Sequence, residues 1–116
     1  MKEQIATELF GRGRRLNCAQ AILTAFRDEF DVTAADIAAA AADGHGKADQ
    51  GRCGALHAGL QLLRDRPDLV ARLEREFVAQ AAAARCRDIR KGRLASCTEC
   101  VAIVARLLER YLAEDT

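Results

Sequence analysis

The chain has 116 residues, of which half are hydrophobic, and 18 basic against 17 acidic side chains give a net charge of +1. This length supports one modest hydrophobic core, so residues 1–116 are predicted to form a single domain. The sequence has no basic tract interleaved with aromatic residues, no N-terminal secretion signal and no apolar run near the ~20 residues that span a bilayer. We therefore expect a soluble, cytoplasmic protein that binds neither nucleic acid nor membranes.

Three helices are predicted in the N-terminal part of the chain. The first runs from about Lys2 to Phe10 and ends before a pair of glycines. A second begins at Asn17, which is a good N-cap residue. The third covers 31–42 and is rich in alanine, with Thr33 as its cap and Ile37 as its only large apolar residue.

Three further helices follow a polar loop over 43–52 that contains three glycines. One starts near Cys53, the next has Pro67 in its first turn, and the last starts at Ser96 in the capping box Ser96-Cys97-Thr98-Glu99. The predicted buried stripes are Leu56, His57, Leu60 and Leu63; Leu69, Leu73, Phe77 and Ala84; and Val101, Val104, Leu107, Leu108 and Tyr111. The charged side chains Arg72, Glu74, Arg75 and Glu76 are expected to be mostly solvated.

No segment alternates with the period of two that a half-buried strand requires. The predicted fold class is therefore all-α, a small helical bundle of four principal helices plus one or two short helices. Its core is built largely from Leu, Ile, Val and Ala, because the chain has only five aromatic rings. Because the core is small and rich in alanine, a homodimer is one possible state of the protein.

The five cysteines are the residues that point to a function. An odd number excludes complete pairing within one monomer, and without a secretion signal reactive thiols or a metal site are favoured over structural disulfides. Cys18, Cys53 and Cys97 each fall in the first turn of a predicted helix, and Cys100 lies one turn beyond Cys97. A helix N-terminus favours thiolate over thiol, so these positions predict low-pKa cysteines.

The segment Cys97-Thr98-Glu99-Cys100 is a C-x-x-C motif at a helix start. In such motifs the first thiol attacks and the second resolves the mixed disulfide. The βαβ context of thioredoxins is absent, so the motif suggests the chemistry without that fold.

Two further residues have open interpretations. His57 follows Cys53 by four residues, so its imidazole could reach the thiol from the same helix face, or it could be an ordinary half-buried residue. Cys86 lies between Arg85 and Arg87, which favour a thiolate. Free cysteines also pack in cores as small hydrophobes, an interpretation that applies most readily to Cys18.

Three functions remain open on these grounds. The first is thiol–disulfide exchange or electron transfer with a partner oxidoreductase, in which Cys97 or Cys53 attacks, Cys100 or another cysteine resolves, and no cofactor is required. The second is a metal-binding module that holds zinc or an iron–sulfur cluster. Its ligands would come from Cys18, Cys53, Cys86, Cys97 and Cys100, with His57 as a further candidate. The third is a non-catalytic helical interaction domain.

Several segments together resemble the C-GCAxxG-C-C family of redox-active proteins. They are Asn17-Cys18-Ala19-Gln20-Ala21, Gly51-Arg52-Cys53-Gly54-Ala55-Leu56, Cys86 and Cys100-Val101. The resemblance spans nearly the whole chain and implies that Cys18, Cys53, Cys86 and Cys100 are the four family cysteines of a small helical redox protein. Arg52, Gly54 and His57 depart from the strict G-C-A-x-x-G string, and Cys97 is an additional thiol.

Overall fold

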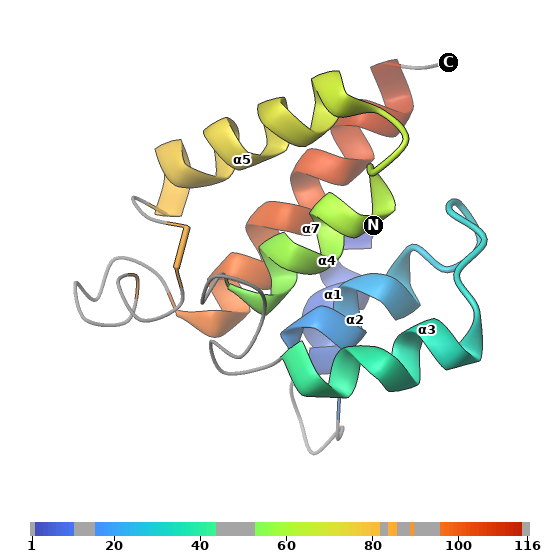
Figure 1. Cartoon of the computed structure of the whole chain (residues 1–116). Helices are drawn as coiled ribbons and strands as arrows, with labels where there is room; N and C mark the ends of the chain where they lie inside the picture. The colour runs from blue at the N-terminus through green and yellow to red at the C-terminus, as the bar shows by residue number, and fades with distance from the viewer. Residues whose placement is uncertain are drawn as a thin grey trace.

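The computed structural model describes residues 2–10, 16–43, 53–81, 84–85, 89 and 96–114. Every element formed by these residues is a helix (Figure 1). The elements are α1 (Lys2–Phe10), α2 (Cys18–Ala25), α3 (Ala34–Ala39), the 3-10 helix η1 (Ala40–Asp43), α4 (Gly54–Leu62), α5 (Pro67–Ala81) and α7 (Cys97–Glu114). The predicted all-α fold class is confirmed.

Helix α7 is the longest of these elements, and it packs against α1, α2, α4 and α5. Figure 1 shows it crossing the molecule beside α5. The stripe predicted for this helix is buried as expected, namely Val101, Val104, Leu107, Leu108 and Tyr111. Because four helices pack on α7, this helix is the centre of the hydrophobic core.

The three predicted N-cap residues, Asn17, Thr33 and Ser96, are confirmed. The Asn17 side chain accepts a hydrogen bond from the Gln20 N–H, and the Thr33 side chain accepts one from the Asp36 N–H. At α7 the Glu99 N–H donates to Ser96 Oγ (3.1 Å) and the Ser96 N–H donates back to Glu99 Oε1 (3.3 Å). Each cap satisfies backbone donors that a helix start otherwise leaves without partners.

Two predicted boundaries differ from the structure. The helix expected over 31–42 begins after Thr33 and stops at Ala39, and the chain continues as the 3-10 helix η1 to Asp43. None of the residues of α3 is buried, so little packing extends it. Helix α5 ends at Ala81, so the half-buried Ala84 follows the helix instead of lying on its stripe. Asp43 belongs to η1, and the rest of the loop predicted over 43–52 lies outside the described residues.

Arg72 is less solvated than its charge suggests. Its guanidinium Cζ lies 4.6 Å from the centre of the Tyr111 ring, and its nitrogens donate to carboxylate oxygens of Glu76 (2.6 Å) and Glu114 (2.6 Å). The expectation of a mostly solvated side chain is therefore wrong for Arg72. The residue joins α5 to the C-terminal turns of α7 by a cation–π contact and an ion pair.

Helix α4 packs closely against α5 and α7 at Gly59. A Cβ atom at this position would lie 2.8 Å from Leu73 Cδ2 and 3.0 Å from Val104 Cγ1. Both distances are shorter than ordinary carbon–carbon contacts. The absence of a side chain at Gly59 thus lets α4 approach α5 and α7. Cys53 directly precedes α4, so this close packing also helps to place Cys53.

None of the helices within the described ranges combines the length and the hydropathy of a bilayer-spanning segment.

Candidate functional site

Three of the five cysteines come together from three separate helices. Cys18 is the first residue of α2, Cys53 is the N-cap of α4, and Cys100 is in the first turn of α7. Their exposed fractions are 8%, 6% and 3%, and none of the three is in a disulfide. The thiols of Cys18 and Cys100 both shift the pKa of Cys53, so the three side chains lie close enough to influence one another's protonation. We call Cys18, Cys53 and Cys100 the thiol cluster.

The helix packing explains why the thiols meet. Helix α2 packs on α4, and both pack on α7. The starts of α4 and α7 lie at the same end of the molecule (Figure 1). In addition, the Cys53 N–H donates to the Ala84 carbonyl (2.9 Å), so the residue that precedes α4 is held by the segment that follows α5. Cys18 and Cys53, 35 positions apart in the sequence, and Cys53 and Cys100, 47 positions apart, are thereby brought close together.

The environment of Cys18 disfavours its thiolate. Contact with the Cys53 thiol and burial raise the pKa of Cys18 far above the ordinary value. The backbone N–H groups of Ala55 and Ala19 also contact this sulfur, and they lower its pKa. The expected effect of a helix N-terminus is therefore present, but it is outweighed by the neighbouring thiol and by the loss of water.

Cys53 shows the same balance. Its contact with Cys100 raises the pKa of Cys53, contact with Cys18 lowers it and burial raises it, with a result of about 12. The Leu56 N–H lowers it further as a backbone donor. The sequence prediction of low-pKa thiols is thus wrong for Cys18 and Cys53, because several sulfurs that share one buried site do not ionise together.

Asn17 positions the first residue of the thiol cluster. Its Oδ1 caps α2 through the Gln20 N–H (2.8 Å), while its Nδ2 donates to the carbonyls of Ala40 (2.9 Å) and Ala41 (3.2 Å). The side chain therefore fixes the start of α2 against η1, one residue before Cys18. The sequence identified the cap, but it held no signal for the bonds to η1.

His57 lies in α4, one turn after Cys53. Its backbone N–H donates to the Cys53 carbonyl (2.9 Å), and its side chain is half-buried. The contacts described above for the Cys53 sulfur are with Cys18 and Cys100, so a pairing of the imidazole with that thiol stays a prediction.

The other two cysteines are described in part or not at all. Cys97 is the first residue of α7, and its side chain lies outside the described part of the structure. Cys86 lies outside the described residues altogether. Their roles as an attacking thiol, as a family cysteine or as metal ligands therefore stay predictions.

The described residues contain no group of three or more His, Cys, Asp or Glu side chains arranged to hold a metal ion. The predicted zinc or iron–sulfur site also drew on Cys86 and Cys97, whose side chains lie outside the described part of the structure. The metal-binding alternative accordingly stays a prediction.

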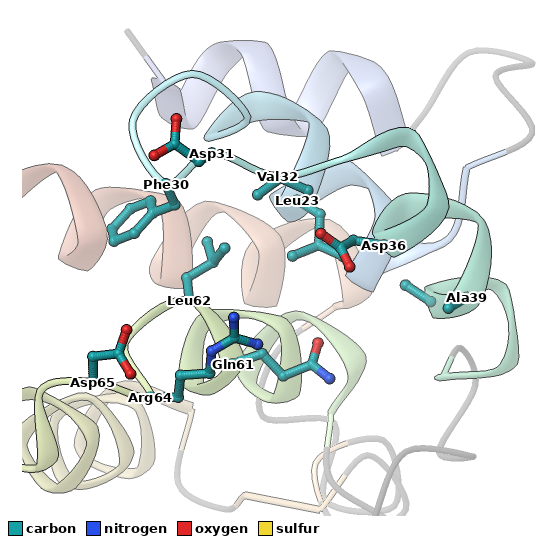
Figure 2. A pocket seen from close by; sticks show the side chains of 11 residues that line it. Leu23, Phe30, Asp31, Val32, Asp36, Ala39, Gln61, Leu62, Arg64 and Asp65 are labelled. Atoms are coloured by element: carbon teal, nitrogen blue, oxygen red, sulfur yellow. The ribbon is translucent and has the colours of Figure 1, made fainter.

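A cavity of about 280 Å³ lies apart from the thiol cluster, between the end of α2, α3 and the end of α4. Figure 2 shows apolar side chains such as Leu23 and Leu62 together with the carboxylates of Asp31 and Asp65. Neither Cys18, Cys53 nor Cys100, the three cysteines whose side chains the structure describes, lines it. No motif in the sequence indicates this cavity, because its walls come from three separate segments.

Comparisons with known proteins identify one family. No curated protein and no solved structure matches the chain. The model of the C_GCAxxG_C_C family, described as "Putative redox-active protein", matches residues 16–111. This range covers most of the chain and includes all five cysteines. The family predicted from the cysteine-containing segments is confirmed, and the chain belongs to the C_GCAxxG_C_C family.

Proposed function

We propose that this protein is a thiol–disulfide redox protein and that the thiol cluster of Cys18, Cys53 and Cys100 is its redox centre. The observation that carries the proposal is the convergence of three buried, free cysteines from the starts of α2, α4 and α7, which pack on one another. A disulfide between two of them needs a Cα separation of about 4.4–6.8 Å. Membership of a redox-active family supports the same chemistry.

The reaction exchanges two electrons with a partner oxidoreductase. One cysteine thiolate attacks a sulfur of the partner's disulfide, forms a mixed disulfide and releases the partner's other sulfur as a thiolate. A second cysteine of this chain then attacks the mixed disulfide, so that an internal disulfide forms and the partner leaves as a dithiol. Two thiols of this protein are oxidised, one disulfide of the partner is reduced, and the two protons pass to the partner's sulfurs.

Cys97 is the attacking thiol in this proposal, and Cys100 is the resolving thiol. The three thiols of the cluster are at most 8% exposed, which hinders direct attack by a bulky protein disulfide. Cys97 is the first residue of α7, and Cys100 follows it by one turn. A partner that reacts with Cys97 would thus be resolved by Cys100, whose thiol also shifts the pKa of Cys53.

A redox titration tests the proposal. The protein is equilibrated in dithiothreitol or glutathione buffers that span about −120 to −300 mV, and its free thiols are counted by alkylation and intact-mass measurement. We expect two thiols to be lost together at one potential. Cys97→Ser should slow the reaction of the reduced protein with a protein disulfide, while Thr98→Ala, an exposed neighbour in the same turn, should react like the wild type.

Two results would contradict the proposal. One is a set of five thiols that never forms an internal disulfide across this range. The other is near-stoichiometric zinc or iron in protein purified anaerobically without chelators, together with thiols that stay protected until the metal is removed, which would favour the metal-binding module. Unchanged partner kinetics in Cys97→Ser would remove Cys97 as the attacking thiol.

A further inference from the structure

The cavity of about 280 Å³ between the end of α2, α3 and the end of α4 has an apolar wall. Its large apolar lining residues are buried or half-buried, namely Leu23, Phe30, Val32 and Leu62. A smaller cavity of about 60 Å³ adjoins it, because Phe30, Leu62 and Asp65 line both, and reaches Leu112 near the end of α7. A hydrocarbon group bound here would therefore be covered by apolar side chains.

The rim of the larger cavity is acidic. Its charged lining residues are the carboxylates of Asp31, Asp36 and Asp65 and the single guanidinium of Arg64, which gives the lining a formal charge of −2. Asp36 Oδ2 already accepts the Thr33 N–H of the α3 capping box (3.0 Å). Neither Asp31 nor Asp65 forms an ion pair or a side-chain hydrogen bond with another residue that the structure describes. Two carboxylates at this cavity are thus left to meet a cation.

The mixture of charge and hydrocarbon indicates the kind of cation. A bare metal ion would leave the apolar wall uncovered, whereas an ammonium ion on a hydrocarbon body covers the wall and meets the carboxylates at once. In the view of Figure 2 the Phe30 ring lies between the carboxylates of Asp31 and Asp65. The face of an aromatic ring also attracts a cation. Charge complementarity therefore favours an organic amine in its protonated form.

We propose that this cavity binds a small organic ammonium ion, with the hydrocarbon body against Leu23, Phe30 and Leu62 and the ammonium group at Asp31 and Asp65. The binding is separate from the proposed redox function, because Cys18, Cys53 and Cys100 do not line the cavity. Since the carboxylates are exposed and the ligand is small, we expect a dissociation constant on the order of 1 mM.

The structure offers clean substitutions for the two carboxylates. Asp31 has a φ of 53°, a conformation that asparagine also tolerates, so Asp31→Asn removes the charge and preserves the backbone. Asp65→Asn is the equivalent change at the end of α4. Each should weaken binding of an ammonium ion by about three- to fivefold. Asp28→Asn, at an exposed position that does not line the cavity, is the matched control and should bind like the wild type.

A second pair of variants tests the space instead of the charge. Ala38 and Ala39 are both exposed residues of α3, and of the two only Ala39 lines the cavity. Ala39→Leu should occupy part of the cavity and weaken binding by about fivefold or more. Ala38→Leu adds the same side chain outside the cavity and should leave the affinity unchanged.

Amide NMR spectra of the full-length reduced protein, titrated with hexylamine hydrochloride at neutral pH, test the proposal. Hexanol and sodium hexanoate carry the same hydrocarbon chain with a neutral and a negative head group. We expect hexylammonium to give saturable shifts at residues 30–32 and 61–65. Hexanol should bind about fivefold more weakly or less, and hexanoate should give no saturable shift.

Three results would overturn the proposal. They are equal affinities for hexylammonium and hexanol, shifts that do not saturate or that lie away from the cavity, and a loss in Asp28→Asn as large as in Asp31→Asn and Asp65→Asn. The wild-type comparison of the three ligands decides the matter even where a variant fails to fold, which its own amide spectrum would reveal. A protein that binds no amine but forms an internal disulfide would contradict this inference and leave the proposed redox function in place.

Discussion

The Asn17 side-chain amide donates a hydrogen bond of 2.9 Å to the Ala40 carbonyl. This bond joins the start of α2 to the 3-10 helix η1, across 23 residues of sequence. The same side chain caps α2 through its oxygen. One amide group therefore performs two separable tasks immediately before Cys18.

Substitutions at Asn17 should separate these two tasks. Asn17→Ala removes both the cap and the bonds to η1, and we expect a loss of about 2 kcal/mol in the free energy of unfolding. Asn17→Asp keeps the cap oxygen but places a negative charge against the Ala40 and Ala41 carbonyls, so we expect a loss of about 1 kcal/mol. Urea denaturation measures both values. An aspartate variant as stable as the wild type would show that the bonds to η1 contribute nothing.

The stability of the reduced protein should fall at alkaline pH because of the buried thiols. Folding raises the pKa of Cys53 from 9.0 to about 12, so the folded protein keeps a proton that the unfolded chain releases. The stabilising contribution is complete below about pH 9, and it is lost as the pH rises toward about 12. Burial and contact with Cys53 raise the pKa of Cys18, which acts in the same direction.

Urea denaturation under reducing conditions, compared at about pH 7.5 and about pH 10.5, measures this loss. Cys53→Ala should lose less stability over the same interval than the wild type does. Lysine and tyrosine titrations are common to both proteins and cancel in the comparison. Equal losses in the two proteins would mean that the cluster thiols do not titrate as described.

Gly59→Ala should destabilise the protein even though alanine favours helices. The new Cβ would lie 2.8 Å from Leu73 Cδ2, and both Leu73 and Val104 are fully buried. Overpacking costs about 1–3 kcal/mol and the helix propensity returns about 1 kcal/mol, so we expect a net loss of about 1 kcal/mol. The double variant with Leu73→Ala should be more stable than the sum of the single changes predicts, because the shorter side chain makes room. Strict additivity would place the strain elsewhere.

Arg72→Ala should lower the free energy of unfolding measurably. Most of this loss comes from the contact with the Tyr111 ring, since Glu114 is about half exposed and its ion pair is screened by water. Arg72→Lys should retain part of the stability, because an ammonium keeps the charge but not the planar stacking. Arg75→Ala, an exposed position on the same helix, is the matched control and should change stability by less than about 0.5 kcal/mol. Equal effects at Arg72 and Arg75 would contradict this account.

The sequence predicted the helices well because their signals are local. Asn17, Thr33 and Ser96 are caps whose side chains act within three residues, and the stripe of α7 repeats with the helical period. The convergence of Cys18, Cys53 and Cys100 has no local signal of this type. It depends on how α2, α4 and α7 pack on one another, and no local pattern encodes that arrangement.

The direction of the pKa shifts was missed for the same reason. A helix start lowers a thiol pKa by a local effect, which a sequence displays. At Cys53 it is outweighed by Cys100, 47 residues away, and by burial. The family, in contrast, could be recognised before the structure, because short segments around Cys18 and Cys53 carry it.

Because the thiols of the cluster come from helices far apart in the chain, each disulfide between them would also act as a crosslink on the unfolded state. A bond between Cys18 and Cys53 would close a loop of roughly 36 residues and one between Cys53 and Cys100 a loop of roughly 48 residues, and chain-entropy arguments assign about 4 kcal/mol to each. Oxidation would then raise the free energy of unfolding. By thermodynamic linkage, folding would in turn make the disulfide harder to reduce. The reduction potential of the surroundings would thus set the stability of the fold as well as the redox state of the cysteines.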